Sequence, residues 1–243
     1  MSRLSYVNVE LPYGHEKVEV KIPQKNLLKI LVPKDMPPVA NQVEAVKKAI
    51  ENPIGSQTIP KLVQSKKAKN AVIIISDLTR LVPDNIIVPI ILDKLNEAGI
   101  PTNKVTVLIA TGTHLPPEWE ELKNRLGKEL VNRVKIEIHN AKDDANLVYV
   151  GKTSLGNDIY INKIVAEADI KIGTGSITPH IIAGYSGGRK IILPGVSGEK
   201  TIQYNHSFRF ILHPNARPGV IDGNPISKDM EEAARLAGLD FIV

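Results

Sequence analysis

The residues A-V-I-I-I-S-D-L-T-R, 71–80, give the clearest indication of the fold class. Its first five residues form an unbroken apolar run, which is typical of a strand covered on both faces. A polar segment with Asp77 and Arg80 follows at once, and residues 85–98 then predict a helix. Pro89 predicts that only the part of this helix after it is regular. A buried strand followed by a helix is the repeating unit of an α/β fold.

The same unit recurs farther along the chain. We predict buried strands at residues 104–110, 134–139 and 168–172, helices at 117–126 and 161–167, and a hairpin at 148–151 and 158–162. Because strands and helices alternate at this spacing, the expected fold class is α/β. It has a mostly parallel sheet, flanked by helices and joined by right-handed crossovers.

Residues 5–33 have a different pattern. Apolar and polar residues alternate in V-N-V-E-L, K-V-E-V-K-I-P and L-L-K-I-L-V-P, which predicts an N-terminal β-strand extension with one buried face. A P-Y-G-H turn that ends at His15 separates the first two strands. Two helices are expected next, at residues 41–51 and from residue 56 or 58 to 66.

The composition excludes several classes of protein. The chain has no cysteine, so disulfide scaffolds, thiolate metal sites and cysteine nucleophiles are ruled out. Hydrophobic residues make up 42% and charged residues 23%, which is typical of a globular protein with a sizeable core. The apolar runs are far shorter than the roughly 20 residues that span a bilayer, and the N-terminus lacks the apolar segment of a signal peptide. We therefore expect a cytoplasmic protein with no membrane partner.

The net charge of +5 raises the question of nucleic acid. The one lysine cluster, Lys66, Lys67 and Lys69, has no interleaved aromatic residues, and aromatic residues make up only 4% of the chain. Base stacking needs aromatic platforms, so we expect no nucleic-acid partner. A small anionic ligand fits the charge equally well.

Titratable side chains follow three of the predicted strands. Asp77 and Arg80 follow the first strand, His114 follows the second and His180 follows the fourth. Ligands of such sheets bind at the carboxyl ends of the strands, so we expect these side chains to meet at one edge. Each has a simpler explanation when taken alone, since an aspartate can cap a turn and a lone histidine is often structural.

Residues 173–206, G-T-G-S-I-T-P-H-I-I-A-G-Y-S-G-G-R-K-I-I-L-P-G-V-S-G-E-K-T-I-Q-Y-N-H, carry the densest group of candidate residues. Seven of the 17 glycines lie here, with His180, Lys190 and His206. Glycine weakens regular structure, so this density indicates a backbone that approaches a ligand closely. The segment does not match the phosphate-binding pattern G-x-x-x-x-G-K-S/T. The three remaining histidines are expected to be structural: His15, His139 and His213.

Four motifs carry a family resemblance. In order, S-D-L-T-R, A-T-G-T-H, P-H-x-x-A-G-Y-S-G-G-R-K-x-x-L-P-G-V and a later N-H resemble the N-terminal domain of the nickel-pincer nucleotide-dependent lactate racemases. The resemblance covers nearly the whole chain. It implies that residues 1–243 form one catalytic and cofactor-binding N-terminal domain. It also implies an isomerase, namely a racemase or epimerase of a 2-hydroxyacid such as lactate.

The resemblance also implies a cofactor and a role for each motif residue. The cofactor is nickel bound to pyridinium-3,5-bisthiocarboxylic acid mononucleotide, made by dedicated biosynthetic enzymes of the cell. The resemblance implies that Lys190 holds the cofactor through a thioamide, that His206 coordinates nickel, and that Asp77, Gly187 and Gly188 contact the cofactor. It implies that His114 and His180 are acid/base groups on opposite faces of the substrate. It also implies that Arg80 binds the substrate carboxylate.

The implied reaction is proton-coupled hydride transfer. A histidine takes the hydroxyl proton while hydride passes to the pyridinium ring and then returns to either face. The residue types suit these roles, because imidazole titrates near neutral pH and guanidinium can bind a carboxylate through two parallel hydrogen bonds. An amine is also the group that can form an amide-type link to a cofactor.

The chain departs from the family in length. Family members continue into a second domain that closes the cleft, whereas this sequence stops at residue 243, in what is expected to be the start of a strand. We therefore expect a truncated chain that is inactive or nearly so by itself, because an open cleft admits water.

Two other hypotheses stay open at this point. His114, His180 and His206 could form a three-histidine zinc site of a hydrolase. The chain could also be a nucleotide-binding module that does no chemistry.

Overall fold

The computed structural model describes residues 5–14, 16–32, 34 and 36–243. Two compact units divide the chain, Met1–Ala40 and Asn41–Val243. Two positions of the predicted N-terminal strands and turn, His15 and Pro33, lie outside the described residues.

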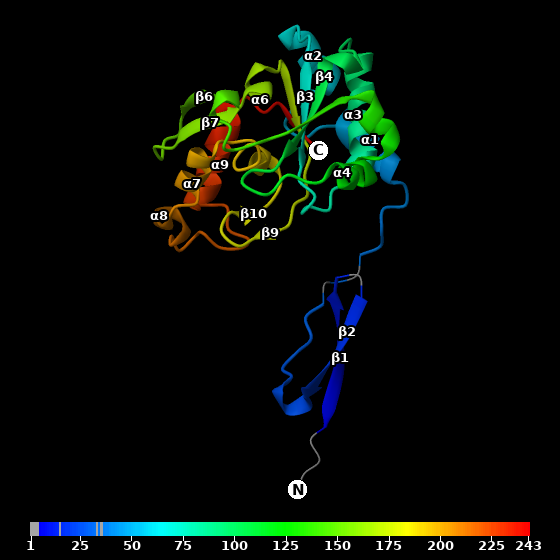
Figure 1. Cartoon of the computed structure of the whole chain (residues 1–243), viewed down its shortest axis with the longest axis vertical. Coiled ribbons are helices and arrows are strands. Elements are labelled where there is room, and N and C mark those ends of the chain that lie inside the picture. Colours follow the sequence, from blue (N-terminus) through cyan, green and yellow to red (C-terminus); the bar gives the residue numbers. More distant parts are fainter. Residues whose placement is uncertain (1–4, 15, 33, 35) are drawn as a thin grey trace. The chain divides into compact units, whose positions relative to one another are not determined.

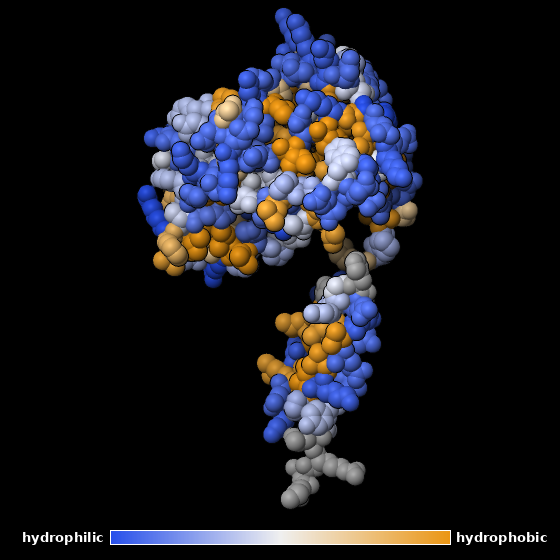
Figure 2. Space-filling view, viewed as in Figure 1, coloured by the Kyte–Doolittle hydropathy of each residue, from blue (hydrophilic) through white to orange (hydrophobic). Residues whose placement is uncertain are grey.

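The first unit is an antiparallel hairpin of β1 (Tyr6–Tyr13) and β2 (Glu16–Pro23), followed by a short 3₁₀ helix, η1 (Gln24–Asn26). This part confirms the predicted β-strand extension. The third predicted strand is wrong, because residues 27–32 form no strand. An alternating strand needs a surface that covers its apolar face. Within this unit Leu28 and Leu31 stay exposed, and hydrophobic surface is visible along the hairpin unit in Figure 2.

A five-stranded sheet forms the centre of the second unit (Figure 1). Its strands are β3 (Ala71–Ser76), β4 (Val105–Ala110), β5 (Lys135–Ile138), β8 (Ile170–Gly173) and β11 (Phe241–Ile242). They run parallel in the order β11-β8-β3-β4-β5, which confirms the predicted parallel sheet. The strand start predicted before residue 243 is β11, which pairs with β8 at the edge.

Helices cover both faces of the sheet. One face carries α1 (Gln42–Glu51), α2 (Ile59–Lys66), α3 (Asp84–Glu97), α4 (Trp119–Leu126) and α5 (Lys128–Arg133). The other carries α6 (Lys163–Glu167), α7 (Glu199–Asn205), α8 (Phe208–Ile211), α9 (Pro225–Leu236) and the hairpin of β6 (Leu147–Lys152) and β7 (Asp158–Asn162). The short 3₁₀ helices η2 (Thr102–Lys104) and η3 (Asp144–Asn146) precede β4 and β6.

The apolar run of β3 explains why the sheet has two cores. Successive side chains of a strand point to opposite faces. Ile73 and Ile75 accordingly pack in the core under α1–α5, whereas Val72 and Ile74 pack in the core under α6–α9. All four side chains are fully buried, as the unbroken apolar run predicted.

The prediction for Pro89 is wrong. Helix α3 begins at Asp84 and runs through Pro89 without ending there. The proline removes one helical hydrogen bond, but Ile87 and Val88 just before it are buried in the core. Burying such a side chain contributes about 1.5–3 kcal/mol, which offsets one missing bond.

Among the residues that the structure describes, no helix combines the length and apolar character that crossing a membrane needs.

Candidate active site

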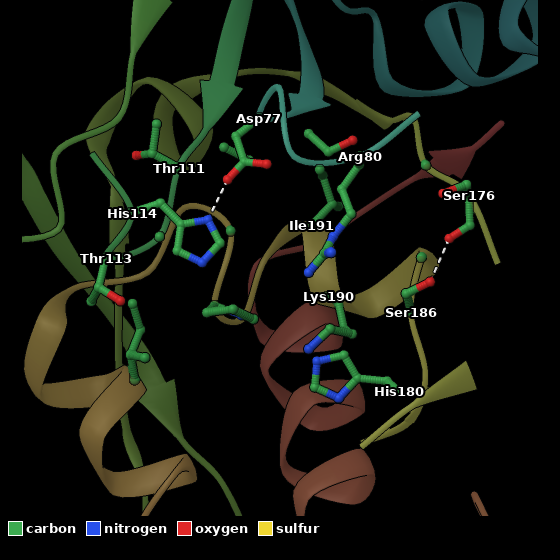
Figure 3. A pocket seen from close by; sticks show the side chains of 18 of the residues that line it. Asp77, Arg80, Thr111, Thr113, His114, Ser176, His180, Ser186, Lys190 and Ile191 are labelled. Carbon is green, nitrogen blue, oxygen red and sulfur yellow. Dashed lines mark hydrogen bonds and ion pairs between the residues drawn. The ribbon is translucent and has the colours of Figure 1, made fainter. Parts of the chain in front are cut away.

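One cavity of about 590 Å³ lies at the carboxyl ends of β3, β4 and β8 (Figure 3). Its lining includes most of the candidate residues: Asp77, Arg80, His114, His180, Gly187, Lys190 and His206. The predicted convergence at one edge of the sheet is therefore present. Gly188 is not part of the lining and instead begins the 3₁₀ helix η4 (Gly188–Ile191).

Asp77 holds His114 in one orientation. One carboxylate oxygen of Asp77 accepts hydrogen bonds from the backbone N–H and the hydroxyl of Thr79. The other contacts Nδ1 of His114, as the dashed line in Figure 3 marks. A carboxylate can only accept, so Nδ1 carries the proton in this pair. Nε2 of the His114 ring then has a free lone pair and can act as a base.

His180 is held in the opposite tautomer. It lies on β9 (Pro179–His180), which pairs with β10 (Gly184–Tyr185). Its Nδ1 accepts from the backbone N–H groups of Ile182 and Ala183, at 3.4 and 3.2 Å. In the neutral ring the proton is therefore on Nε2. Burial, with the positive charges of Lys190 and Arg80, lowers the pKa of His180 to about 4, so the ring is neutral at pH 7.

Lys190 lies in η4, and its side chain is beside the ring of His180 in Figure 3. Burial lowers the pKa of the Lys190 amine to about 8, and the charges of Arg189 and Arg80 act in the same direction. A large fraction of this amine is therefore neutral near pH 8, and a neutral amine is the nucleophilic form.

His206 is the C-cap residue of α7, and one nitrogen of its ring is available to bind a ligand. Its Nδ1 lies 3.2 Å from the carbonyl oxygen of Ile202, to which it donates. Burial is the main cause that lowers the pKa of His206, followed by the charge of Lys190. A neutral imidazole whose Nδ1 donates to a carbonyl presents Nε2 as a metal ligand.

The glycines around Lys190 are required by chain packing. A Cβ on Gly195 would lie 2.1 Å from the carbonyl oxygen of Ile191, and one on Gly184 would lie 2.2 Å from that of Val220. Gly187 has φ +74°, and a Cβ there would lie 3.0 Å from the carbonyl oxygen of Ser176. The sequence indicated glycines that make room for a ligand, whereas Gly184 and Gly195 make room for neighbouring backbone. A cofactor contact of Gly187 stays a prediction.

Several lining residues were missed by the sequence analysis. Ser186 joins the β9–β10 hairpin to the wall of the cavity, because its hydroxyl donates to the carbonyl of Ser176 and accepts from the backbone N–H of Thr178. Glu199 and Gln203 line the cavity from α7. Their spacing to His206 is helical, so a helix prediction for this segment would have identified them.

Two of the three histidines expected to be structural lie among the described residues. His139 is buried, with Nε2 2.9 Å from the carbonyl oxygen of Ser197 and Nδ1 3.1 Å from the side-chain amide of Asn162. Burial lowers the pKa of His139. His213 accepts from the backbone N–H of Asn215. Neither histidine lines the cavity.

The residues present fit the cofactor that the resemblance implies better than they fit a conventional metal site. Within the described ranges, no group of three or more His, Cys, Asp or Glu side chains could hold a metal ion. The three-histidine zinc site is therefore not formed in this conformation. A lysine-linked metal cofactor needs fewer protein ligands, and the cavity offers the Lys190 amine and Nε2 of His206. Its volume is that of a typical small-molecule site.

Comparisons with known proteins agree with this geometry. Residues 13–219 match the family described as "Lactate racemase N-terminal domain". The chain is 42% identical over 239 residues to the lactate racemase of Lactiplantibacillus plantarum, which covers 98% of this chain and 56% of that protein. It is 40% identical over 238 residues to the lactate racemase of Thermoanaerobacterium thermosaccharolyticum, covering 97% of this chain and 55% of that one.

Solved structures give the same result. The structure of the lactate racemase apoprotein from Thermoanaerobacterium thermosaccharolyticum matches with a TM-score of 0.86 and 39% identity, over 97% of this chain and 55% of that chain. A protein from Thermotoga maritima matches with a TM-score of 0.62 and 24% identity, over 80% of this chain and 47% of that chain, which shows a shared fold alone. The chain spans about half the length of the curated relatives it matches.

Proposed function

This chain belongs to the lactate racemase N-terminal domain family, and we propose that it carries the acid/base and cofactor-binding residues of a racemase or epimerase for a 2-hydroxyacid such as lactate. The observation that carries the proposal is the pair of histidines held in opposite tautomers within one cavity, beside Lys190 and Arg80.

The two histidines supply the proton chemistry. Racemisation needs a group that removes a proton and a group that returns one, on opposite faces of the substrate. Nε2 of His114 is free to accept the hydroxyl proton of a bound 2-hydroxyacid. In the neutral ring, Nε2–H of His180 donates a hydrogen bond to the substrate oxygen, because both backbone N–H bonds go to its Nδ1. To return a proton, the ring must first be protonated to the imidazolium, since a neutral imidazole that lost Nε2–H would be left as an anion. In our proposal the two rings exchange these roles when the opposite enantiomer binds, which requires His180 to carry its proton on Nδ1 and to release the backbone N–H groups of Ile182 and Ala183.

Arg80 binds the substrate carboxylate in this proposal. It is the guanidinium of the S-D-L-T-R motif and lines the same cavity as both histidines. A planar guanidinium can form two parallel hydrogen bonds to a carboxylate and thereby fix its orientation. The hydroxyl-bearing carbon is then held at a defined place between the two rings.

Lys190 and His206 hold the cofactor in this proposal. The Lys190 amine would hold the cofactor through a thioamide, and Nε2 of His206 would be the protein ligand to nickel. The lowered pKa of Lys190 and the bonded Nδ1 of His206 support these roles. When bound, the nickel-pincer nucleotide would supply the ring that accepts and returns hydride. The enzymes that make this cofactor are the expected cellular partners, and a cytoplasmic location stays a prediction from the sequence.

A racemisation assay tests the proposal. The chain is produced with the cofactor-making enzymes, alone and as a chimera in which it replaces the matching part of the Lactiplantibacillus plantarum racemase. Each protein is given both enantiomers of several 2-hydroxyacids, and the product is resolved by chiral chromatography. We expect turnover by the chimera, loss of turnover with His114→Gln or His180→Gln, and little change with the control His213→Gln, which lies outside the cavity.

The chimera and the chain alone test different parts of the proposal. A chimera that carries cofactor and nickel but racemises none of the acids would contradict the proposal and favour a nucleotide-binding module. Turnover by the 243-residue chain alone at the rate of the chimera would contradict the expectation that it is nearly inactive by itself.

A further inference from the structure

Arg125 on α4 forms a buried ion pair and lies outside the four sequence motifs. Its Nη2 pairs with a carboxylate oxygen of Asp84, the first residue of α3. The side chain of Asp84 is 0% exposed and that of Arg125 is 13% exposed. The other terminal nitrogen of Arg125, Nη1, donates to the backbone carbonyl of Asp77.

These two bonds hold both ends of one loop. The loop after β3 begins at Asp77 and ends where α3 begins at Asp84, and it contributes Asp77 and Arg80 to the cavity. The carbonyl oxygen of Asp77 also accepts from the backbone N–H of Arg80, at 3.3 Å, which closes a turn. A single guanidinium therefore bridges the residue where the loop begins and the residue where it ends.

Asp84 links the same loop to a second wall of the cavity. Its other carboxylate oxygen accepts from the hydroxyl of Thr174 at 2.8 Å. Thr174 follows β8, lines the cavity and is itself buried. Through Asp77 and His114 the network also reaches the loop after β4. Three loops of the cavity are therefore joined through Arg125 and Asp84.

The chemistry of the pair favours a positioning role over a purely stabilising one. Burial raises the pKa of the Asp84 carboxyl, and the Arg125 charge and the Thr174 hydroxyl oppose that rise. A buried ion pair often stabilises a fold no more than apolar side chains of the same size would. Nε of Arg125 is buried and has no hydrogen-bond partner among the described residues, so the guanidinium is aligned on its two acceptors at the expense of its third donor nitrogen. A planar guanidinium carries donors on separate nitrogen atoms in a fixed geometry, which suits the two acceptors of Arg125, the Asp84 carboxylate and the Asp77 carbonyl.

We propose that Arg125 and Asp84 are positioning residues: they fix the backbone of Asp77 so that its carboxylate holds His114 with the proton on Nδ1 and the lone pair of Nε2 in the cavity. The catalytic meaning of this arrangement rests on the proposed function. The arrangement itself can be measured in the chain without cofactor or substrate.

Nitrogen-15 NMR of the histidine rings tests the proposal, because long-range couplings distinguish the two neutral tautomers. In the wild-type chain, we expect the neutral His114 ring to be in the Nδ1–H form. In Arg125→Lys and in Asp84→Asn we expect a folded chain in which His114 becomes a mixture of tautomers. His139, which is bonded to Ser197, should not change. The control is Arg133→Lys, since Arg133 pairs with Asp93 at the surface, at 3.6 Å, and with no other carboxylate of the described residues.

The outcomes separate positioning from plain stability. If the variants lower the urea midpoint but leave His114 in the Nδ1–H form, Arg125 and Asp84 are structural and the proposal is wrong. If no variant folds, the wild-type spectrum still decides, because an Nε2–H tautomer of His114 contradicts the proposal. In the loaded chimera, Arg125→Lys should lower turnover by about 100-fold with nickel content unchanged, as expected when a catalytic group is displaced by about 1 Å. Failure of the racemisation assay would leave the NMR result intact.

Discussion

Lys190 should acylate far more readily at mildly alkaline pH than an ordinary lysine. Burial and two arginine charges lower the pKa of its amine to about 8, whereas an unperturbed lysine titrates near about 10.4. At pH 8 about half of the Lys190 amine is neutral, compared with about 0.4% of an ordinary lysine amine. The neutral fraction therefore differs by about a hundredfold.

Trace labelling measures this difference. The folded chain is treated with a small amount of isotopically labelled acetic anhydride at a series of pH values, and the remaining amines are then acetylated in denaturant with unlabelled reagent. Mass spectrometry of the Lys190 peptide gives labelling against pH. We expect a midpoint near 8 for the folded chain and near about 10.4 for the denatured chain. A midpoint above about 10 in the folded chain would refute the inference that the amine is desolvated in the cavity.

Two further measurements check the lowered pKa of Lys190: the effect of a neighbouring charge and the pH dependence of the free energy of unfolding. Arg80→Gln removes a positive charge that lowers the Lys190 pKa, so the midpoint should rise, whereas the surface control Arg133→Gln should not move it. The unfolded chain binds more protons at Lys190 than the folded chain between the two pKa values. The free energy of unfolding should therefore increase from about pH 8 to about pH 10.5, and this increment should disappear in Lys190→Met.

Three further predictions concern the surroundings of the cavity. Gly195→Ala places a Cβ 2.1 Å from the carbonyl oxygen of Ile191, so the free energy of unfolding, measured with urea, should fall by about 1–3 kcal/mol or more. An unchanged urea midpoint would contradict the packing explanation. Asp229→Ala removes the acceptor of three buried neutral donors, and at about 1–3 kcal/mol for each unsatisfied group it should lower the free energy of unfolding by about 3 kcal/mol or more, also by urea unfolding. A cost below about 1 kcal/mol would argue against this. The ring of His180 should titrate near pH 4 by NMR, and a midpoint near about 6.5 would show a solvated ring.

The sheet and the convergence of the motifs could be predicted because they follow from local patterns. The apolar run 71–75 is long enough to identify a doubly covered strand, and parallel strands place their following loops at one edge. The side-chain oxygen of Asn41 accepts from the backbone N–H of Glu44 and caps α1, and asparagine is a residue type that favours this position. Helix α9 was missed, although Asn224 before Pro225 is a start signal.

The rest of the site depends on contacts between residues far apart in the sequence. The bond from Arg125 to Asp84 joins residues that are 41 positions apart, and no periodicity or motif in the sequence predicts it. Gly184 is required by the carbonyl oxygen of Val220, which reaches it from a different segment. The tautomers of His114 and His180 depend on a carboxylate and on two backbone N–H groups that only the folded chain brings to them.

Mass mapping of Lys190 tests whether the cofactor is attached to this residue. The chain and the Lactiplantibacillus plantarum lactate racemase are produced in one host with the cofactor-making enzymes, digested and compared by mass spectrometry. We predict a mass increment of the cofactor on the peptide that contains Lys190, its loss in Lys190→Arg, and its retention without nickel in His206→Ala. An unmodified Lys190 beside a modified control enzyme, or an increment on a different lysine, would contradict the claim that the cavity is built around this amine.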